Sequence, residues 1–197
     1  MVWQASLLDS GAPSVHGGVE ASRRHLDDTS WIDVAEGWMA GADALFASLL
    51  ASVTWSCPEV VMWGALLDQP RLSARLDLED GDTPEAIRQI GAALTDRYGR
   101  AFDSVGLNLY RDGTDSVAWH GDRIGREVSR PVVALVSLGH RRPLLLRPVG
   151  GGRSVRFEPG RGDLLVMGGE CQRRWQHSVP KVAHAGPRLS LAFRHSA

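Results

Sequence analysis

The second half of the chain consists of short runs of β-forming residues, and this pattern constrains the fold more than any other feature. From Val105 onward, runs of roughly four to seven residues are separated by Gly, Pro and charged residues. The expected strands cover residues 105–110, 117–122, 132–138, 144–147, 154–157, 163–167, 175–179 and 189–194. Short strands that follow helices predict an α+β fold, a double-stranded β-helix (jelly roll) buttressed by N-terminal helices on one side.

Two helices are expected before the strands. Apolar residues recur at helical spacing between Ala42 and Leu50, which predicts a helix that ends before Thr54. The second helix is expected to have Thr83 as N-cap, Pro84 at its first position and Gly99 as its stop. Its apolar stripe consists of Ile87, Ile90, Leu94 and Tyr98.

Length and composition indicate a single soluble domain over residues 1–197. No apolar run approaches the roughly 20 residues of a membrane span, and the N-terminus lacks the features of a secretory signal. Cys57 and Cys171 are the only cysteines, which fits a reducing compartment, so a cytoplasmic monomer that does not contact membranes is expected. Residues 1–30 are rich in Gly, Ser and Asp without a clear period, and they are expected to form a loose arm.

The small net charge of −1 conceals a strong asymmetry along the chain. Residues 1–119 carry 8 Arg against 18 acidic residues, whereas residues 120–197 carry 13 Arg and one Lys against 5 acidic residues. A basic half suits a polyanion such as nucleic acid, because neutralised phosphates release counterions. The alternative is that the two halves simply pair with each other.

A His-x-Asp element, His120-Gly-Asp122, is a candidate metal chelator. Residues i and i+2 of a strand point to the same face, so the imidazole and the carboxylate can bind one ion from one rigid element. A second copy at His25-Leu-Asp27 lies in a polar stretch without a strand pattern, and we therefore favour His120. An open iron site also needs a third ligand from a distant strand, for which His177, His140, His184 and His195 all compete.

The last expected strand carries two arginines on one face. Period two separates an apolar face from a cationic one, which consists of Arg188, Ser190, Ala192 and Arg194. Two inward guanidiniums are costly to bury without anions, and a dicarboxylate would pair with both. Surface arginines on an edge strand are the alternative.

Together these segments resemble the AlkB-type iron(II) and 2-oxoglutarate-dependent dioxygenases, which demethylate alkylated nucleic acid by oxidation. The resemblance covers roughly Val53 to Arg194 and is dense from Asn108. Its elements are Asn108-Leu-Tyr110-Arg-Asp-Gly113, Trp119-His120-Gly-Asp122, the segment from Gln172 to Lys181, and the strand from Arg188 to Arg194, whose two arginines are six positions apart.

The resemblance implies a role for each polar group of these elements. His120, Asp122 and His177 would bind Fe(II). Arg188 would hold the distal carboxylate of 2-oxoglutarate, assisted by Tyr110 and Ser190, while Arg194 and Asn108 would attend the carboxylate that chelates the metal. With O2 as the other cosubstrate, the implied reaction releases formaldehyde, succinate and CO2.

The resemblance further implies that residues 31–104 hold the helices and a nucleotide-recognition lid, and that residues 105–197 form the catalytic core. Met62 and Trp63, followed by Gln69-Pro-Arg71-Leu, resemble this lid and would contact the base, unless both are core residues of an N-terminal strand. Arg111, Arg141 and Arg142 are expected near phosphates or as solvated loop charges. Ile124 is expected at the substrate.

Two segments depart from the family pattern. Ser73-Ala-Arg75 stands where many relatives carry an aromatic that stacks on the flipped base, and Arg123-Ile124-Gly125 stands where DNA-repair members often place an acidic residue. The expected function is oxidative demethylation of N-alkylated bases in DNA, with single strands preferred and RNA as a possible substrate. The alternatives are the same chemistry on a modified RNA, a protein or a small molecule, and a non-catalytic nucleic-acid-binding jelly roll.

Overall fold

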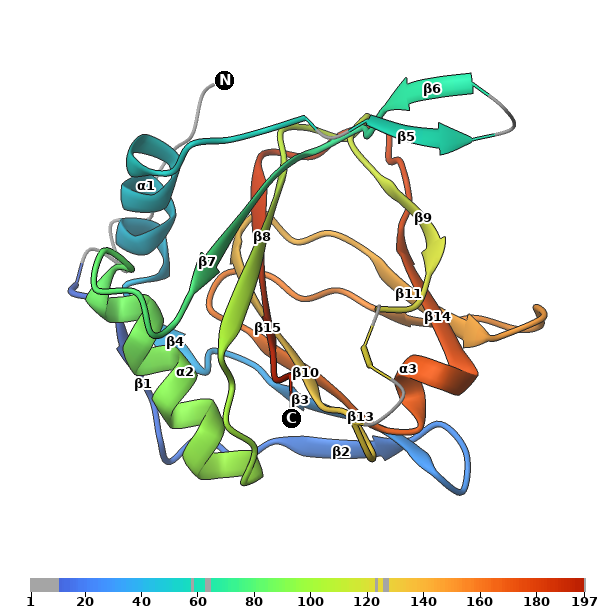
Figure 1. The fold of residues 1–197 in the computed structure, drawn as a ribbon, viewed down its shortest axis with the longest axis horizontal. Helices are drawn as coiled ribbons and strands as arrows, with labels where there is room; N and C mark the ends of the chain where they lie inside the picture. The colour runs from blue at the N-terminus through green and yellow to red at the C-terminus, as the bar shows by residue number, and fades with distance from the viewer. Residues whose placement is uncertain (1–10, 58, 63–64, 123, 126–127, 197) are drawn as a thin grey trace.

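Two antiparallel sheets and two main helices form the core of the fold in the computed structural model, which describes residues 11–57, 59–62, 65–122, 124–125 and 128–196. The seven-stranded major sheet has the order β2-β3-β13-β10-β15-β8-β7, and the four-stranded minor sheet has the order β12-β11-β14-β9 (Figure 1). The major-sheet strands are β2 (Ser22–His25), β3 (Ser30–Ala35), β7 (Leu72–Asp77), β8 (Ser104–Tyr110), β10 (Val133–Gly139), β13 (Leu164–Gly169) and β15 (Arg188–Arg194). The minor-sheet strands are β9 (Val117–His120), β11 (Leu144–Pro148), β12 (Val155–Phe157) and β14 (Trp175–Val179).

All eight strands expected after residue 104 are present, with ends within two residues of the expected ones. The remaining elements are β1 (Ser14–Val15), β4 (Met39–Ala40), α1 (Ala42–Ser52), β5 (Glu59–Met62), β6 (Ala65–Asp68), α2 (Glu85–Tyr98) and α3 (Cys171–Arg174). The helical prediction for residues 42–50 is confirmed by α1.

The two faces of the major sheet bury different cores. On one face, Leu189, Leu191 and Phe193 of β15 pack with apolar residues of α1 and α2, which lie on this side of the sheet in Figure 1. On the other face, Leu135 and Ala192 pack toward Leu146 of the minor sheet. The alternation predicted for the last strand is therefore confirmed, and the cationic face of β15 points between the two sheets.

Residues 14–30 correct the expectation of a loose arm. Strand β2 pairs with β3 from Ser22↔Val34 to His25↔Trp31, and β1 pairs with β4. Strand β2 shows no apolar alternation because it is an edge strand whose four side chains are all exposed. His25 thus lies on a strand, contrary to our expectation, but on an exposed edge away from the pocket residues described below.

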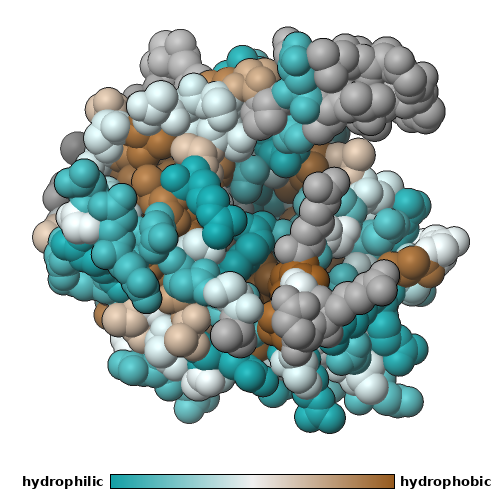
Figure 2. Space-filling model, viewed as in Figure 1, coloured by the Kyte–Doolittle hydropathy of each residue, from teal (hydrophilic) through white to brown (hydrophobic). Residues whose placement is uncertain are grey.

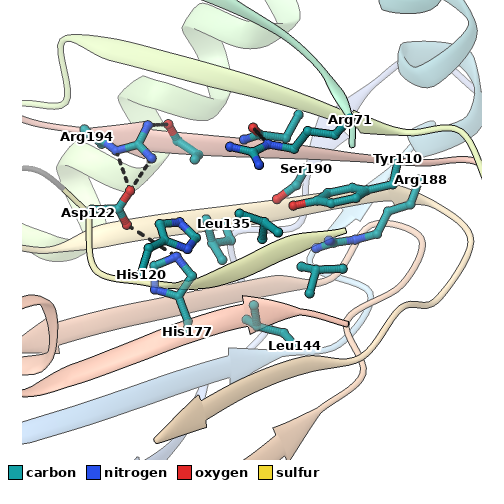
Figure 3. A pocket seen from close by; sticks show the side chains of 14 residues that line it. Arg71, Tyr110, His120, Asp122, Leu135, Leu144, His177, Arg188, Ser190 and Arg194 are labelled. Carbon is teal, nitrogen blue, oxygen red and sulfur yellow. Dashed lines mark hydrogen bonds and ion pairs between the residues drawn. The ribbon is translucent and has the colours of Figure 1, made fainter. Parts of the chain in front are cut away.

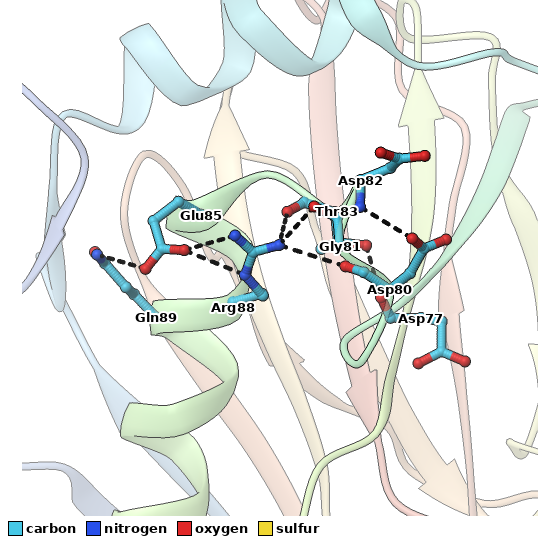
Figure 4. Close-up of polar contacts among 8 residues, drawn as sticks. All are labelled: Asp77, Asp80, Gly81, Asp82, Thr83, Glu85, Arg88 and Gln89. Carbon is cyan, nitrogen blue, oxygen red and sulfur yellow. Dashed lines mark hydrogen bonds and ion pairs between the residues drawn. The ribbon is translucent and has the colours of Figure 1, made fainter.

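The start of α2 also differs from the expectation. The helix begins at Glu85 with Pro84 as N-cap, and the Thr83 hydroxyl donates to Asp77 O at 2.6 Å instead of capping the helix. The side chain of Arg88 holds the loop that precedes the helix. Its Nη1 donates to the carbonyls of Gly81 at 3.0 Å and Thr83 at 2.6 Å, as Figure 4 shows. The predicted stop is confirmed, because Gly99 adopts the left-handed conformation with φ of 62°.

The surface is mostly polar on the face drawn in Figure 2, with smaller hydrophobic patches between the hydrophilic side chains. In the described part of the chain, none of the helices has the length and hydropathy needed to cross a membrane. The two halves of opposite charge are joined among these residues by the ion pairs Arg161–Asp43 and Arg174–Asp27, while the other ion pairs lie within one half. Among the described residues, the ion pairs found between the halves therefore involve two cations of the basic half, Arg161 and Arg174.

Candidate active site

The pocket between the two sheets collects most of the polar residues that the sequence singled out. It has a free volume of about 490 Å³, counting space open to solvent, and its wall combines both sheets (Figure 3). The lining residues are Arg71, Asn108, Tyr110, Val117, His120, Asp122, Leu135, Leu144, His177, Val179, Arg188, Ser190, Ala192 and Arg194.

Strand register explains why these side chains meet. In the minor sheet, His120 of β9 lies directly opposite His177 of β14, and their ring centroids are 4.2 Å apart. In the major sheet, Tyr110 pairs with Arg188, and Asn108 pairs with Ser190. The two histidines therefore come from one sheet and the other polar groups mainly from the other, on the faces that look toward each other.

Asp122 and His177 form the inner part of the pocket. Asp122 Oδ2 lies 3.9 Å from His177 Nε2, and Arg194 donates to Asp122 Oδ1 through both Nε, at 3.1 Å, and Nη2. Burial raises the pKa of Asp122, but the charges of Arg194, His177 and His120 and the hydrogen bond from Arg194 together outweigh this and hold the pKa below its usual range. Burial lowers the pKa of His177 to about 4, so this imidazole is neutral at pH 7.

These donors suit a divalent transition metal in type and protonation state. Asp122 Oδ2 is buried and makes no hydrogen bond with the described residues. His120 Nδ1 lies 2.9 Å from the Ala118 carbonyl, which can only accept, so Nδ1 is the donor of this contact and Nε2 is the ring nitrogen that remains for a metal. Among the described residues, no three such donors are gathered as closely as in a filled metal centre. The fit thus rests on donor chemistry, shared location and the free oxygen of Asp122.

Arg188 suits the distal carboxylate of a diacid. Its side chain is fully buried. Its Nη2 donates to Ser137 Oγ at 2.8 Å, and its Nε has no hydrogen-bond partner among the described residues. Burial lowers the pKa of Arg188 to about 10, which leaves it charged at pH 7. A buried guanidinium with a free donor is costly unless an anion pairs with it. Tyr110 lies alongside, with its ring centroid 5.5 Å from the guanidinium carbon.

Arg71 is a pocket residue whose place in the site the sequence did not predict. It precedes β7, and its Nε donates to Asn108 Oδ1 at 2.8 Å. Asn108 was expected to contact the carboxylate of 2-oxoglutarate that chelates the metal. The structure shows that it also accepts a hydrogen bond from Arg71, so Arg71 joins Arg194 as a second arginine near the expected position of that carboxylate. Leu135 and Leu144 were also missed, because strand periodicity alone does not tell which sheet their faces meet.

The residues expected at the substrate are less clearly placed. Met62 ends β5 of the β5–β6 hairpin, which lies above β9 in Figure 1, and Trp63 is outside the described residues. Arg111 forms a two-pronged ion pair with Asp115 and does not line the pocket. Ile124 is partly buried against the core between the sheets.

Arg142 corrects the expectation of a loop cation near phosphate. It is fully buried and donates to the carbonyls of Asp112, Asp115 and Pro180 at 2.6, 2.8 and 3.0 Å. Its role is therefore structural. Arg141 lies half exposed and pairs with Asp163 at 3.6 Å.

The competing histidines do not reach the pocket. His140 and His184 are exposed, and His195 is buried elsewhere, where its Nε2 accepts the Val132 amide at 3.0 Å. His177 is thus the histidine that the structure brings to His120 and Asp122.

Comparison with known proteins identifies the class to which this fold and pocket belong. Residues 70–194 match the 2OG-Fe(II) oxygenase superfamily, so the chain belongs to this family, whose members use Fe(II), 2-oxoglutarate and O2. A prolyl hydroxylase from Trichoplax adhaerens, solved with a peptide fragment of the hypoxia inducible factor oxygen degradation domain, shares the fold. Its TM-score is 0.56 at 17% identity, over 75% of this chain and 74% of that one.

Curated relatives confirm the resemblance to AlkB-type proteins within this family. The chain is 30% identical to the bovine (Bos taurus) alpha-ketoglutarate-dependent dioxygenase alkB homolog 3, over 78% of this chain and 61% of the relative. It is 35% identical to the Arabidopsis thaliana DNA oxidative demethylase ALKBH2, over 49% of this chain and 38% of the relative. The chain therefore spans about three fifths of the length of the bovine relative.

Proposed function

We propose that this protein is an Fe(II)- and 2-oxoglutarate-dependent dioxygenase that demethylates N-alkylated bases in DNA, with single strands preferred. One observation supports this most strongly: a His-His-carboxylate set and a fully buried arginine with a free donor line the same pocket from opposite sheets. The names of the relatives, a dioxygenase and a DNA oxidative demethylase, point to the same chemistry.

In this proposal, His120, Asp122 and His177 hold the metal, which activates O2 for oxidation of the N-alkyl carbon. The chain's own part is to bind and orient. Arg188 and Ser190 hold the distal carboxylate of 2-oxoglutarate, and Tyr110 packs against that end of the pocket. Arg194 helps to keep Asp122 ionised, and because it bonds to Oδ1 it leaves Oδ2 facing His177.

At the other end, Arg71 and Asn108 are placed to orient the carboxylate nearest the metal or the incoming base. Met62, Trp63, Arg111 and Ile124 are proposed contacts of the nucleic acid, with the β5–β6 hairpin as the recognition lid. A base must leave its stack to enter a pocket of this depth, at a cost of a few kcal/mol that is smallest in single strands. That cost is the physical reason for the proposed strand preference.

The test is turnover of methylated oligonucleotides with iron, ascorbate and 2-oxoglutarate. We expect formaldehyde and succinate to be released and the unmodified base to be restored, as scored by mass spectrometry. His120→Ala and Asp122→Ala should abolish both products, whereas His184→Ala, which changes an exposed histidine, should not. Turnover of no methylated DNA or RNA, despite succinate formation, would instead indicate a protein or small-molecule substrate.

A further inference from the structure

Strand β9, which carries His120, has few backbone contacts to hold it. It is the edge strand of the minor sheet, and within the described parts of the chain it pairs with β14 alone. The pairing consists of His177↔His120 and Val179↔Val117, with a register shift between them. An irregular two-pair ladder at a sheet edge leaves a strand free to shift, and a metal ligand must be held within a few tenths of an ångström.

A side chain on the outer face of the same sheet compensates for this. Because Leu146 and His177 point inward as a register pair, their neighbours Arg147 and Gln176 point outward, and so does Trp119, next to His120. The guanidinium carbon of Arg147 lies 4.1 Å from the centroid of the Trp119 ring. Since β14 separates β11 from β9, Arg147 reaches across the middle strand to the edge strand.

The contact with Trp119 accounts for the placement of the Arg147 guanidinium. Its Nε is buried and makes no hydrogen bond to the described residues, and no ion pair of Arg147 with a carboxylate is found among them. Arg147 is partly buried, and a guanidinium over an indole face is a favourable geometry for a cation–π contact. The stack thus joins β11 to the residue next to His120.

We propose that Arg147 is a positioning residue for His120, which it holds in place through Trp119, so that the outer face of the minor sheet sets the geometry of the site on the inner face. This inference rests on the metal-binding role of His120 in the proposed function. It assigns to Arg147 and Trp119 a task in metal binding although neither lines the pocket.

The test is Mn(II) affinity, measured by calorimetry or electron paramagnetic resonance on the whole chain, which requires no turnover. We expect Arg147→Gln to weaken Mn(II) binding by on the order of 10- to 100-fold, the usual effect of losing a group that orients a metal ligand. Arg147→Lys, which keeps a cation over the ring, should restore part of the affinity. Arg23→Gln is a control for loss of an arginine–tryptophan stack away from the pocket, because Arg23 stacks on Trp31 at 3.7 Å, although it also pairs with Asp33. It should lower stability without changing Mn(II) affinity.

A double-mutant cycle separates positioning from a general effect on folding. In the His120→Ala background, Arg147→Gln should cause no further loss of Mn(II) affinity, because the ligand that it orients is gone. An equal loss in both backgrounds, or wild-type affinity in Arg147→Gln, would overturn the inference while leaving the proposed function intact. Failure of the wild-type protein to bind Mn(II) would overturn the metal site and this inference with it.

Discussion

At the scale of single residues, two fully buried arginines, Arg188 and Arg142, differ in their partners. Both have an Nε without a hydrogen-bond partner among the described residues, but Arg142 donates through its two Nη groups to three carbonyls, whereas Arg188 donates to one hydroxyl and lines the pocket. We expect Arg188→Met to raise the Kd for 2-oxoglutarate by about 10- to 100-fold, since charge-assisted hydrogen bonds contribute about 1.5–3 kcal/mol. Calorimetry in the presence of Mn(II) measures this Kd.

Arg142→Met provides the control for this prediction. It leaves three buried carbonyls without a donor, at about 1–3 kcal/mol each, and should lower Tm strongly. Arg188→Met should leave Tm unchanged or raise it, because replacing a buried unpaired charge by an apolar side chain removes a desolvation cost. A fall in Tm with unchanged Kd for Arg188→Met would contradict the role of Arg188.

His177 makes stability depend on pH in a definite direction. Its pKa is lowered to about 4 in the folded protein, so below about pH 6.5 the unfolded chain binds a proton that the folded one does not. Stability should therefore be complete above pH 6.5 and fall between about pH 6.5 and 4, by on the order of 3 kcal/mol. Urea unfolding with a chelator present measures this, and His177→Gln should show a smaller fall over the same interval.

Which residues could be predicted from the sequence depended on how local their signal was. Period two predicted that His120 and Asp122 share one face and that Arg188 and Arg194 share another, although β9 ends at His120 and Asp122 follows it. That all four line one pocket was implied by the family resemblance. Arg71 was not placed in the site because its position depends on β7 pairing beside β8, a contact between distant segments. Arg142 was misjudged because nothing local shows that three carbonyls surround it.

At the scale of elements, Arg88 fixes the loop that joins β7 to α2. It contacts three loop carbonyls as well as Glu85 from the first turn of the helix, where no side chain caps the helix (Figure 4). We expect Arg88→Ala to lower the free energy of unfolding by about 1–2 kcal/mol, after allowance for its partial exposure. Gln89→Ala, which removes only a contact with Glu85, should change it by less than about 0.5 kcal/mol in urea unfolding.

Elements with an apolar face were predictable, and elements without one were not. The strands after residue 104 alternate or are apolar throughout because at least one face of each packs in a core. All four side chains of strand β2 are exposed, so its sequence lacks the apolar residues that would have predicted a strand pairing with β3. The start of α2 was misplaced by one residue because the Thr83 hydroxyl bonds to Asp77 O, outside the helix.

At the scale of the whole molecule, charge separates two kinds of binding. Residues 120–197 carry most of the positive charge, and few of these cations pair with the acidic half among the described residues. If nucleic acid binds this surface, its affinity should fall steeply with salt, by on the order of 10³-fold between 50 and 200 mM for about six phosphate contacts. Binding of 2-oxoglutarate at the buried Arg188 should change far less, because salt screens enclosed charges weakly. Titrations of a methylated oligonucleotide and of 2-oxoglutarate over this salt range compare the two, and equal salt dependence would contradict a polyanion on the basic half.

The pairing of His120 directly opposite His177 also bears on how the chain reaches its native state. A slip of one residue between β9 and β14 turns the side chains of the slipped strand to the other face, so that only one of the two imidazoles still points between the sheets. An ion that needs both rings can bind only the native register. Metal binding would therefore favour the native register during folding. By mass action it stabilises chains in which β9 and β14 pair correctly, whereas chains with a shifted register gain no such stabilisation and can separate and pair again.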